Sequence, residues 1–430
     1  MGAIRDLAER AWQGDLEKNQ VHPGNALVGF EELEEGLGFM SAFSNVGVVK
    51  TGEGLVFLDT SSLFHAARLH EEVRRWTDDR VHTAIYTHGH VDHVFGLGPF
   101  EQEAESRSEP PTRVIAHEAC TARFDRYRLT RGYNGIINQR QFGFDEPFFP
   151  NRFRYPDETV SSHQAFEVGG CEIRLFHDKG ETDDHLWAWL PDRRTIYTGD
   201  LFIWASPNCG NPQKAQRYPR EWAIALRRMA ELGAEILMPG HGPVIFGADR
   251  VREALSEAAL LLETILDQTL SLMNEGARLD EILHAVEMPV DLLARPWLRP
   301  VYDDPRFIVR NLWRLYGGWY DGNPAHLLPA PEADVARALA AVAGGAATLA
   351  ARAEREAAEG RLDVAAHLVE FATTAEPANA NIHAIRAQIY HARRREERSL
   401  MSKGIFGAAA RDSEARLSGS SDGEEPERAE

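Results

Sequence analysis

The sequence predicts a layered α/β domain followed by an all-helical domain. In the first 248 residues, short runs of β-branched and aromatic residues alternate with helical patterns, which is typical of sheets covered by helices. Several of these runs end in polar residues, so a functional site at the strand ends is expected. From Asp249 onward, apolar residues keep helical spacing and no convincing strand is present.

The strands expected in the first domain are short and are bounded by turn residues. Gly52 and Gly54 mark a turn between two of them, and a helix is expected at Ser61–Trp76. The expected strands are Phe39–Ser44, Val46–Lys50, Leu55–Asp59, Thr83–Tyr86, Arg113–Ala116, Cys171–Phe176, His185–Leu190, Thr195–Thr198 and Glu235–Met238.

The second domain is expected to be built from helices alone. The last three have small residues where neighbouring helices approach closely, as tetratricopeptide-like pairs do. The domains are therefore expected at 1–248 and 249–400, with 401–430 as a disordered acidic tail because large apolar side chains are scarce there. The expected helices are Val251–Glu275, Arg278–Ala285, Phe307–Tyr316, Ala333–Ala341, Ala346–Ala358, Leu362–Thr374 and Ala380–Glu397.

The composition limits the classes of partner and the location. A formal charge of −19 disfavours nucleic acids and anionic membrane surfaces, which need a basic footprint, but not a small anionic substrate. No apolar run approaches the roughly 18 residues that span a bilayer, and residues 1–20 lack the apolar core of a signal peptide. The three cysteines fit no disulfide framework, so a cytoplasmic location is expected.

The segment that follows the strand Thr83–Tyr86 concentrates potential metal ligands. His88, His90, Asp92 and His93 fall within six residues, and side chains at alternate positions of a turn can converge on one ion. His88 and His90 are expected to do so, while the other two turn toward a second ion. Imidazole and carboxylate suit zinc, and also iron or manganese. Two such ions about 3.5–4 Å apart can activate water at neutral pH.

Further ligands are expected at the ends of later strands. Asp200 follows the strand Thr195–Thr198 and is placed to bridge two ions. His241 follows another apolar strand and is flanked by Gly240 and Gly242, which allow the backbone to come close to an ion.

Together these motifs resemble the metallo-β-lactamase superfamily over about residues 36–247. The pattern HxHxDH, then Gly-Asp, then Pro-Gly-His-Gly carries the resemblance. It implies a four-layer αββα sandwich with a hydrolytic metal site. Where members usually have a histidine, this chain has Glu181, and a glutamate there is similar to the alkylsulfatase branch (class III sulfatases). Glu181 is thus the expected ligand and His185 the alternative, with a hydrogen-bonding role preferred for His185.

A second resemblance covers about residues 249–397. The segment Tyr316–Leu327 combines aromatic residues, glycines and an Asn-Pro turn. It closely resembles a signature of the alkylsulfatase dimerisation domain, which implies a homodimer formed through the helical domain. The two resemblances together are more specific than either alone.

Substrate-binding residues are expected in two segments. Tyr133 and Asn134 could donate hydrogen bonds to an anion, although an ordinary polar loop is the simpler interpretation. Lys214 and Arg217 could hold a sulfate or carboxylate, next to Asn208. Alkylsulfatases carry a histidine beside the corresponding asparagine, and Pro207 stands there in this chain. An acid that protonates the leaving alcohol is therefore not evident.

These observations predict a two-zinc hydrolase that cleaves a small anionic sulfate ester. His88, His90 and Glu181 would hold one ion and Asp92, His93 and His241 the other, with Asp200 between them. Asp92, Asp200 and Glu181 are the expected catalytic carboxylates. The alternatives are hydrolysis of a lactone, thioester or phosphoester at the same site, a non-hydrolytic iron protein, and a helical interaction module whose metal domain is vestigial.

Overall fold

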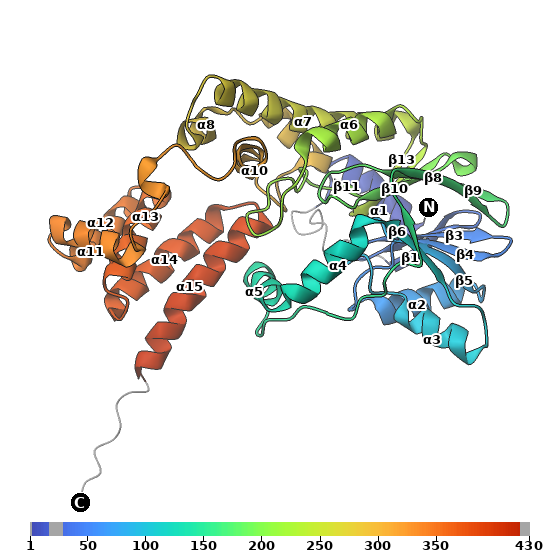
Figure 1. The fold of residues 1–430 in the computed structure, drawn as a ribbon, viewed down its shortest axis with the longest axis horizontal. Coiled ribbons are helices and arrows are strands. Elements are labelled where there is room, and N and C mark those ends of the chain that lie inside the picture. The colour runs from blue at the N-terminus through green and yellow to red at the C-terminus, as the bar shows by residue number, and fades with distance from the viewer. Residues whose placement is uncertain (1, 17–28, 422–430) are drawn as a thin grey trace, which may run out of the picture. The chain divides into compact units, whose positions relative to one another are not determined.

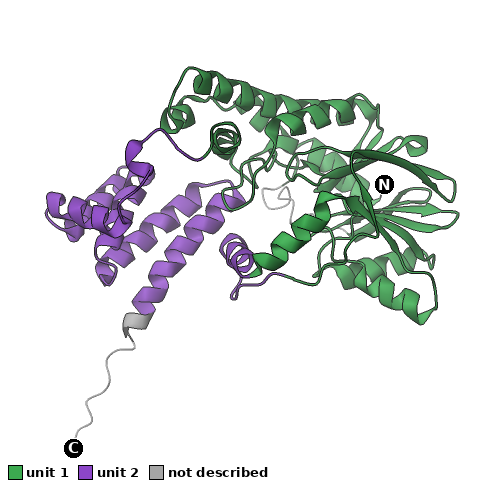
Figure 2. Ribbon diagram, in the orientation of Figure 1, with its two compact units in different colours: residues 1–131, 150–318 green, residues 132–149, 319–430 purple. Residues whose placement is uncertain are grey.

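The computed structural model describes residues 2–16 and 29–421. The described parts of two ranges each form a compact unit, residues 1–131 with 150–318 and residues 132–149 with 319–430 (Figure 2). The mixed α/β domain and the helical domain expected from the sequence are both present. The division between the units falls at 318 rather than at 248, because α7 (Ala248–Asn274) packs on α6 (Pro219–Ala230) and shares its apolar core.

The first unit contains two sheets. The first has seven strands in sequence order, antiparallel from β1 to β4 and parallel from β4 to β7. Its strands are β1 (Gly29–Glu34), β2 (Leu37–Ser41), β3 (Val46–Thr51), β4 (Gly54–Leu58), β5 (Val81–Ile85), β6 (Arg113–His117) and β7 (Glu158–Val160). The second sheet runs in the order β13-β12-β11-β10-β9-β8, with β11 and β12 parallel. Its strands are β8 (His163–Val168), β9 (Cys171–His177), β10 (Leu186–Leu190), β11 (Thr195–Ile203), β12 (Ile236–His241) and β13 (Ile245–Phe246).

Both faces of the central strands are apolar, and this places the sheets face to face with helices outside. In β10, Leu186 and Ala188 point into the core between the sheets, whereas Trp187 and Trp189 point to the helices on the other side. In β4, Val56 faces the second sheet, and its neighbours face the outer helices. The result is the expected αββα order (Figure 1).

Separate helices cover each outer face. The first sheet is covered by α2 (Ala66–Trp76), α3 (Gly98–Ser106) and α4 (Ala119–Leu129), and the second by α6, α7 and α10 (Arg306–Gly317). The expected helix Ser61–Trp76 begins five residues later than predicted. Asp59 and Ser61 have positive φ angles of 59° and 64°, which is incompatible with a helix there.

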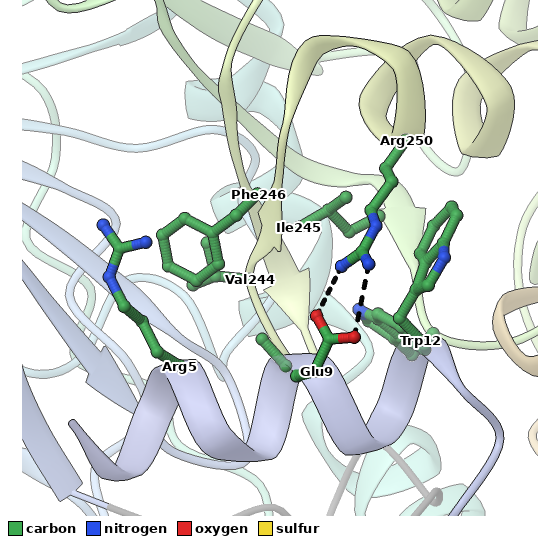
Figure 3. Close-up of a pocket in the computed structure, with 9 residues that line it drawn as sticks. Arg5, Glu9, Trp12, Val244, Ile245, Phe246 and Arg250 are labelled. Carbon is green, nitrogen blue, oxygen red and sulfur yellow. Dashed lines mark hydrogen bonds and ion pairs between the residues drawn. The ribbon is translucent and has the colours of Figure 1, made fainter. Parts of the chain in front are cut away.

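Helix α1 (Ala3–Trp12) packs against β13 and the start of α7 (Figure 3). The Arg5 guanidinium lies 4.1 Å from the centre of the Phe246 ring, and Glu9 forms an ion pair of 2.6 Å with Arg250. The Trp12 ring stacks on Trp297 with ring centres 4.2 Å apart. Contacts with Phe246 of β13, Arg250 of α7 and Trp297 thus hold the N-terminal helix in place by charge and aromatic packing.

The second unit is helical in both of its parts, and α5 (Arg131–Phe142) forms most of the shorter one. The helices of the longer part pack mainly through alanines. They are α11 (Glu332–Ala343), α12 (Ala346–Ala358), α13 (Leu362–Ala375), α14 (Ala380–Glu396) and α15 (Leu400–Ser421). The expected disordered tail from 401 is wrong as far as residue 421, because Phe406 and Ala410 of α15 pack against Tyr390 of α14. Residues 422–430 of that tail lie outside the described residues. In the described part of the chain no single helix is long and apolar enough to cross a membrane; only the bent pair α11–α12 passes by length and composition.

Candidate metal centre

Seven predicted ligands lie close together where strands of both sheets end. The loop after β5 supplies four, β11 and β12 supply one each, and the loop between β9 and β10 supplies the last. These residues are His88, His90, Asp92, His93, Asp200, His241 and Glu181.

The ligands form two groups with one carboxylate between them. The ligand atoms of His88, His90, Glu181 and Asp200 lie within 4.8 Å of one another, and so do those of Asp92, His93 and His241. Asp200 faces both groups. Its Oδ2 lies 3.7 Å from Nε2 of His88, whereas its Oδ1 lies 3.3 Å from Nε2 of both His93 and His241.

Hydrogen bonds at Nδ1 of three of the four rings, His88, His93 and His241, leave Nε2 facing the cluster. Nδ1 of His93 lies 2.8 Å from an Asp59 oxygen, and Nδ1 of His88 lies 3.0 Å from the Thr87 hydroxyl. Nδ1 of His241 donates to the Phe43 carbonyl. An imidazole whose second nitrogen is held in this way is preorganised as a metal ligand.

Asp59 supports this arrangement, and its role was not predicted from the sequence. Its carboxylate accepts hydrogen bonds from the Thr87 amide at 2.7 Å, from the Thr87 hydroxyl at 2.8 Å and from His93. The available signal was a polar residue directly after an apolar strand, which is the same signal that identified Asp200. The partners of Asp59 come from another loop, so the signal alone does not reveal them.

Two glycines beside His241 are required by close packing. A Cβ on Gly240 would lie 2.2 Å from Oδ1 of Asp200. Gly242 has a φ of 88°, and a Cβ there would lie 2.6 Å from the Trp204 ring. Glycine is the residue that fits both positions. The expected approach of this backbone to an ion stays a prediction.

The cluster contains strongly perturbed acids and bases. Burial lowers the pKa of His88 and His90 well below the usual histidine value. The neighbouring imidazoles add to this effect at His88, and Arg123 and Arg217 add to it at His90. Burial also acts on His241, but Asp200 and Asp92 outweigh it and raise the pKa of that ring to about 9. Against its own burial, the carboxyl of Asp200 has a pKa held well below the usual range by His241 and His93. Such mutual perturbation is typical of functional sites.

Glu181, and not the alternative His185, lies with the other predicted ligands. Among the described residues, the two converging groups include Glu181 and not His185. Nε2 of His185 instead accepts a hydrogen bond of 3.1 Å from the Asp200 amide. Burial raises the pKa of Glu181 to about 8, with Arg217 opposing this effect and Asp200 adding to it.

The predicted substrate-binding residues have different environments. Arg217 is 2% exposed and pairs with Glu181, so the expectation that it holds the substrate anion does not agree with its placement. Asn208 is also buried and donates to Glu181 at 2.6 Å. A buried guanidinium needs a carboxylate partner, and Glu181 supplies it. Tyr133, 61% exposed, and Asn134, buried, belong to the second unit, and their predicted role stays a prediction.

Lys214 and Tyr302 also interact electrostatically with the cluster. Burial and nearby Arg217 lower the pKa of Lys214 to about 8, and Asp92 and Glu181 oppose the decrease. Burial, followed by Glu181, Asp92 and Asp200, raises the pKa of Tyr302 well above its usual value, so its phenol stays protonated. Tyr302 was not singled out from the sequence.

The residues fit a metal cofactor. Oδ1 of Asp200 is buried and has no hydrogen-bond partner, although it faces two imidazole nitrogens at 3.3 Å. Buried polar atoms are normally paired, so an unpaired carboxylate oxygen among ligand atoms indicates a place for a cation. Histidine with aspartate and glutamate is a donor set suited to zinc, iron or manganese.

Comparison with known families gives two matches that together cover most of the chain. Residues 42–241 match the metallo-beta-lactamase superfamily, and residues 278–416 match the alkyl sulfatase dimerisation family. All seven candidate ligands lie within the first match.

Similar proteins agree with these matches. The chain is 26% identical over 321 residues to a linear primary-alkylsulfatase of Pseudomonas sp. (strain ATCC 19151). This alignment covers 69% of this chain and 60% of that protein. It is 24% identical over 371 residues to an (R)-specific secondary-alkylsulfatase of Pseudomonas sp., covering 80% and 56%. The chain thus spans less than two thirds of the length of these relatives.

A solved structure shares the fold. A double mutant of the sec-alkyl sulfatase PisA1 superposes with a TM-score of 0.82 at 20% identity, over 94% of this chain and 70% of that chain. The likeness extends over both the α/β and the helical parts. The chain therefore belongs to the metallo-β-lactamase superfamily and carries an alkyl sulfatase dimerisation domain.

Proposed function

We propose that this protein is a two-metal hydrolase of sulfate esters, with zinc as its metal. The position of Asp200 carries the proposal, since its two oxygens face two separate ligand groups. The names of the relatives, a primary and a secondary alkylsulfatase, support the choice of sulfate esters. Metal pairs at such sites supply Lewis-acid stabilisation of negative charge and lower the pKa of water.

The side chains divide the work between holding metal and holding substrate. His88, His90 and Glu181 would hold one ion, the second group the other, and Asp200 would be shared. Lys214 would bind the anionic sulfate group, because its ammonium group lies near the cluster and its charge opposes that of the substrate. Tyr302 would donate a hydrogen bond to a substrate oxygen from its neutral phenol.

Metal analysis of the wild-type protein and of Asp200→Ala tests the site. The wild-type protein, purified without added metal and then loaded, is expected to contain two zinc ions per chain. The variant is expected to lose at least one ion and its turnover, because each ligand group loses one oxygen of the shared Asp200 carboxylate. Arg220→Ala, an exposed residue of α6, serves as the control. A folded Asp200→Ala protein with full metal content and activity contradicts the proposal; iron as the metal retained on purification contradicts zinc.

A second candidate reaction is hydrolysis of another ester at the same site. The pairing of Arg217 with Glu181 favours this candidate, because it removes one of the two cations expected to bind sulfate. Pro207, at the position of the histidine in alkylsulfatases, points in the same direction. A panel of alkyl and aryl sulfates, lactones, thioesters and phosphodiesters, assayed on one metal-loaded preparation, separates the two reactions. Preference for a non-sulfate ester rejects the sulfatase proposal and leaves the metal site in place.

The dimerisation family match supports a homodimer formed through the helical domain. Several large apolar side chains of this domain are exposed, and Leu328 and Val342 are each 90% exposed. Sedimentation should therefore give twice the chain mass of 48.1 kDa. If these side chains lie in the dimer contact, Leu328→Glu and Val342→Glu should shift the mass toward the monomer. A monomeric wild-type protein contradicts the proposal.

A further inference from the structure

The carboxylate of Glu181 is held by two buried donors. The Arg217 guanidinium contacts Oε1 through Nη1, and the Asn208 amide donates to the same oxygen at 2.6 Å. Nη1 of Arg217 also donates to the Asn208 carbonyl, so the three residues form one closed set of contacts. All three residues are at most 5% exposed. We call them the Glu181 clamp.

The clamp is fixed from behind by Asn311 on α10. The Asn311 side chain accepts a hydrogen bond of 3.3 Å from the Arg217 amide and donates one of 3.0 Å to the Arg217 carbonyl. The Gln216 side chain donates to the same Asn311 oxygen at 2.7 Å. Asn311 is itself buried and lies within the region matched by the dimerisation family. A residue outside the matched catalytic domain therefore supports a predicted ligand inside it.

The clamp stabilises the charge of the Glu181 carboxylate. Glu181 is buried, and its carboxylate lies in the same ligand group as that of Asp200. Burial and a neighbouring carboxylate are both unfavourable for a charged carboxylate unless a cation pairs with it. A ligand carboxylate must be ionised to bind a metal. The Arg217 guanidinium opposes both effects, and two donors on one oxygen fix the plane of the carboxylate. Arg217 therefore pairs with the predicted metal ligand Glu181 rather than with the substrate.

We propose that Arg217 and Asn208 are positioning residues for Glu181, and that Asn311 links α10 to metal affinity through Arg217. The inference rests on the proposed function, because it takes Glu181 as a metal ligand. Of the two basic residues expected to bind the substrate anion, Lys214 and Arg217, the inference leaves only Lys214 in that role. Residues that orient ligand carboxylates typically change metal affinity by about 10–100-fold when removed.

A competition titration of Zn²⁺ against a chromophoric chelator measures the effect without turnover. Arg217→Met and Asn311→Ala are expected to weaken Zn²⁺ binding about 10–100-fold, and Arg217→Lys is expected to recover part of the loss. Arg220→Met, the same change on the exposed face of α6, should leave the affinity unaltered. Thermal unfolding of the metal-free proteins shows whether each variant still folds. Asn208→Ala, which removes one donor to Glu181 and is a smaller change at the clamp, is titrated in the same way.

A double-mutant cycle separates positioning from a general structural effect. In a Glu181→Gln background, Arg217→Met should change Zn²⁺ affinity little, because the carboxylate on which it acts is gone. Unchanged Zn²⁺ affinity in the folded Arg217 and Asn208 variants, with a raised KM, overturns the inference in favour of substrate binding. Equal losses in both backgrounds also overturn it. If the wild-type protein binds no metal, the proposed function itself fails, and a missing sulfatase activity leaves the affinity test intact.

Discussion

Replacing Asp59 by asparagine should weaken metal binding, although Asp59 belongs to neither ligand group. The Asp59 carboxylate accepts hydrogen bonds from the Thr87 amide, the Thr87 hydroxyl and Nδ1 of His93, at 2.7, 2.8 and 2.8 Å. Asparagine keeps one acceptor oxygen and presents an NH₂ group at the other position. At least one of the three donors then lies against the new NH₂ group. If that group replaces Oδ2, both the Thr87 hydroxyl and Nδ1 of His93 lose their acceptor.

The expected loss follows from the burial of this contact. Both Asp59 and His93 are fully buried, so a lost hydrogen bond is not replaced by water. A hydrogen bond to a charged group contributes about 1.5–3 kcal/mol, which corresponds to roughly 10–150-fold in an equilibrium constant. If the cost falls on the orientation of His93, metal affinity should decrease by about the same factor, as when other supports of ligand histidines are removed.

The assay is a chelator competition titration of folded Asp59→Asn against the wild-type protein, with circular dichroism as the check on folding. Tyr197→Phe is the matched control, because the Tyr197 hydroxyl donates to the Asn45 carbonyl at 2.8 Å and makes only a longer contact of 3.2 Å with Oδ2 of Asp59. Its effect on metal affinity should be much smaller. A folded Asp59→Asn protein with wild-type affinity would refute the view that Asp59 orients His93.

Three further predictions concern other groups. Lys214→Gln should raise KM for an anionic ester about tenfold, the scale of one charged hydrogen bond. The wild-type pKa of Lys214 is about 8, so its charge is lost as pH rises through that value; KM should rise there in the wild type and stay flat in the variant, which a pH series of KM measures. Tyr302→Phe should lower kcat/KM at unchanged metal affinity, and a changed affinity would reject its assignment to substrate. Trp12→Ala should lower the free energy of unfolding in denaturant by about 2 kcal/mol through loss of its stacking on Trp297, whereas Trp319→Ala, 68% exposed, should have little effect.

The sequence was most informative where ligands are close along the chain or follow an apolar strand. The ligands from His88 to His93 can be recognised because four potential ligands fall within six residues. Asp200 and His241 can be recognised by their position at strand ends. The structure brings all of them together with Glu181. The central strands were also predictable, because β-branched runs such as those of β3 and β4 are buried on both faces.

Long-range pairing was not predictable in the same way. Arg217 was expected to face an anionic substrate, since nothing local shows that its partner is Glu181, 36 residues away. The supporting roles of Asp59 and Asn311 depend on contacts between loops and helices that periodicity does not encode. Helix α15 was missed because its polar residues suggested disorder, whereas a few small and aromatic residues suffice to dock it on α14.

The origin of the ligands in two sheets has a thermodynamic consequence. His88 to His93 follow β5 of one sheet, and Asp200 and His241 belong to β11 and β12 of the other. An ion held by both sets binds only when the sheets are packed together, so by mass action it stabilises their association in proportion to the logarithm of its concentration over Kd. Scarcity of metal would then loosen the sandwich itself, and the resistance of this domain to unfolding and proteolysis would report how much metal the cell supplies.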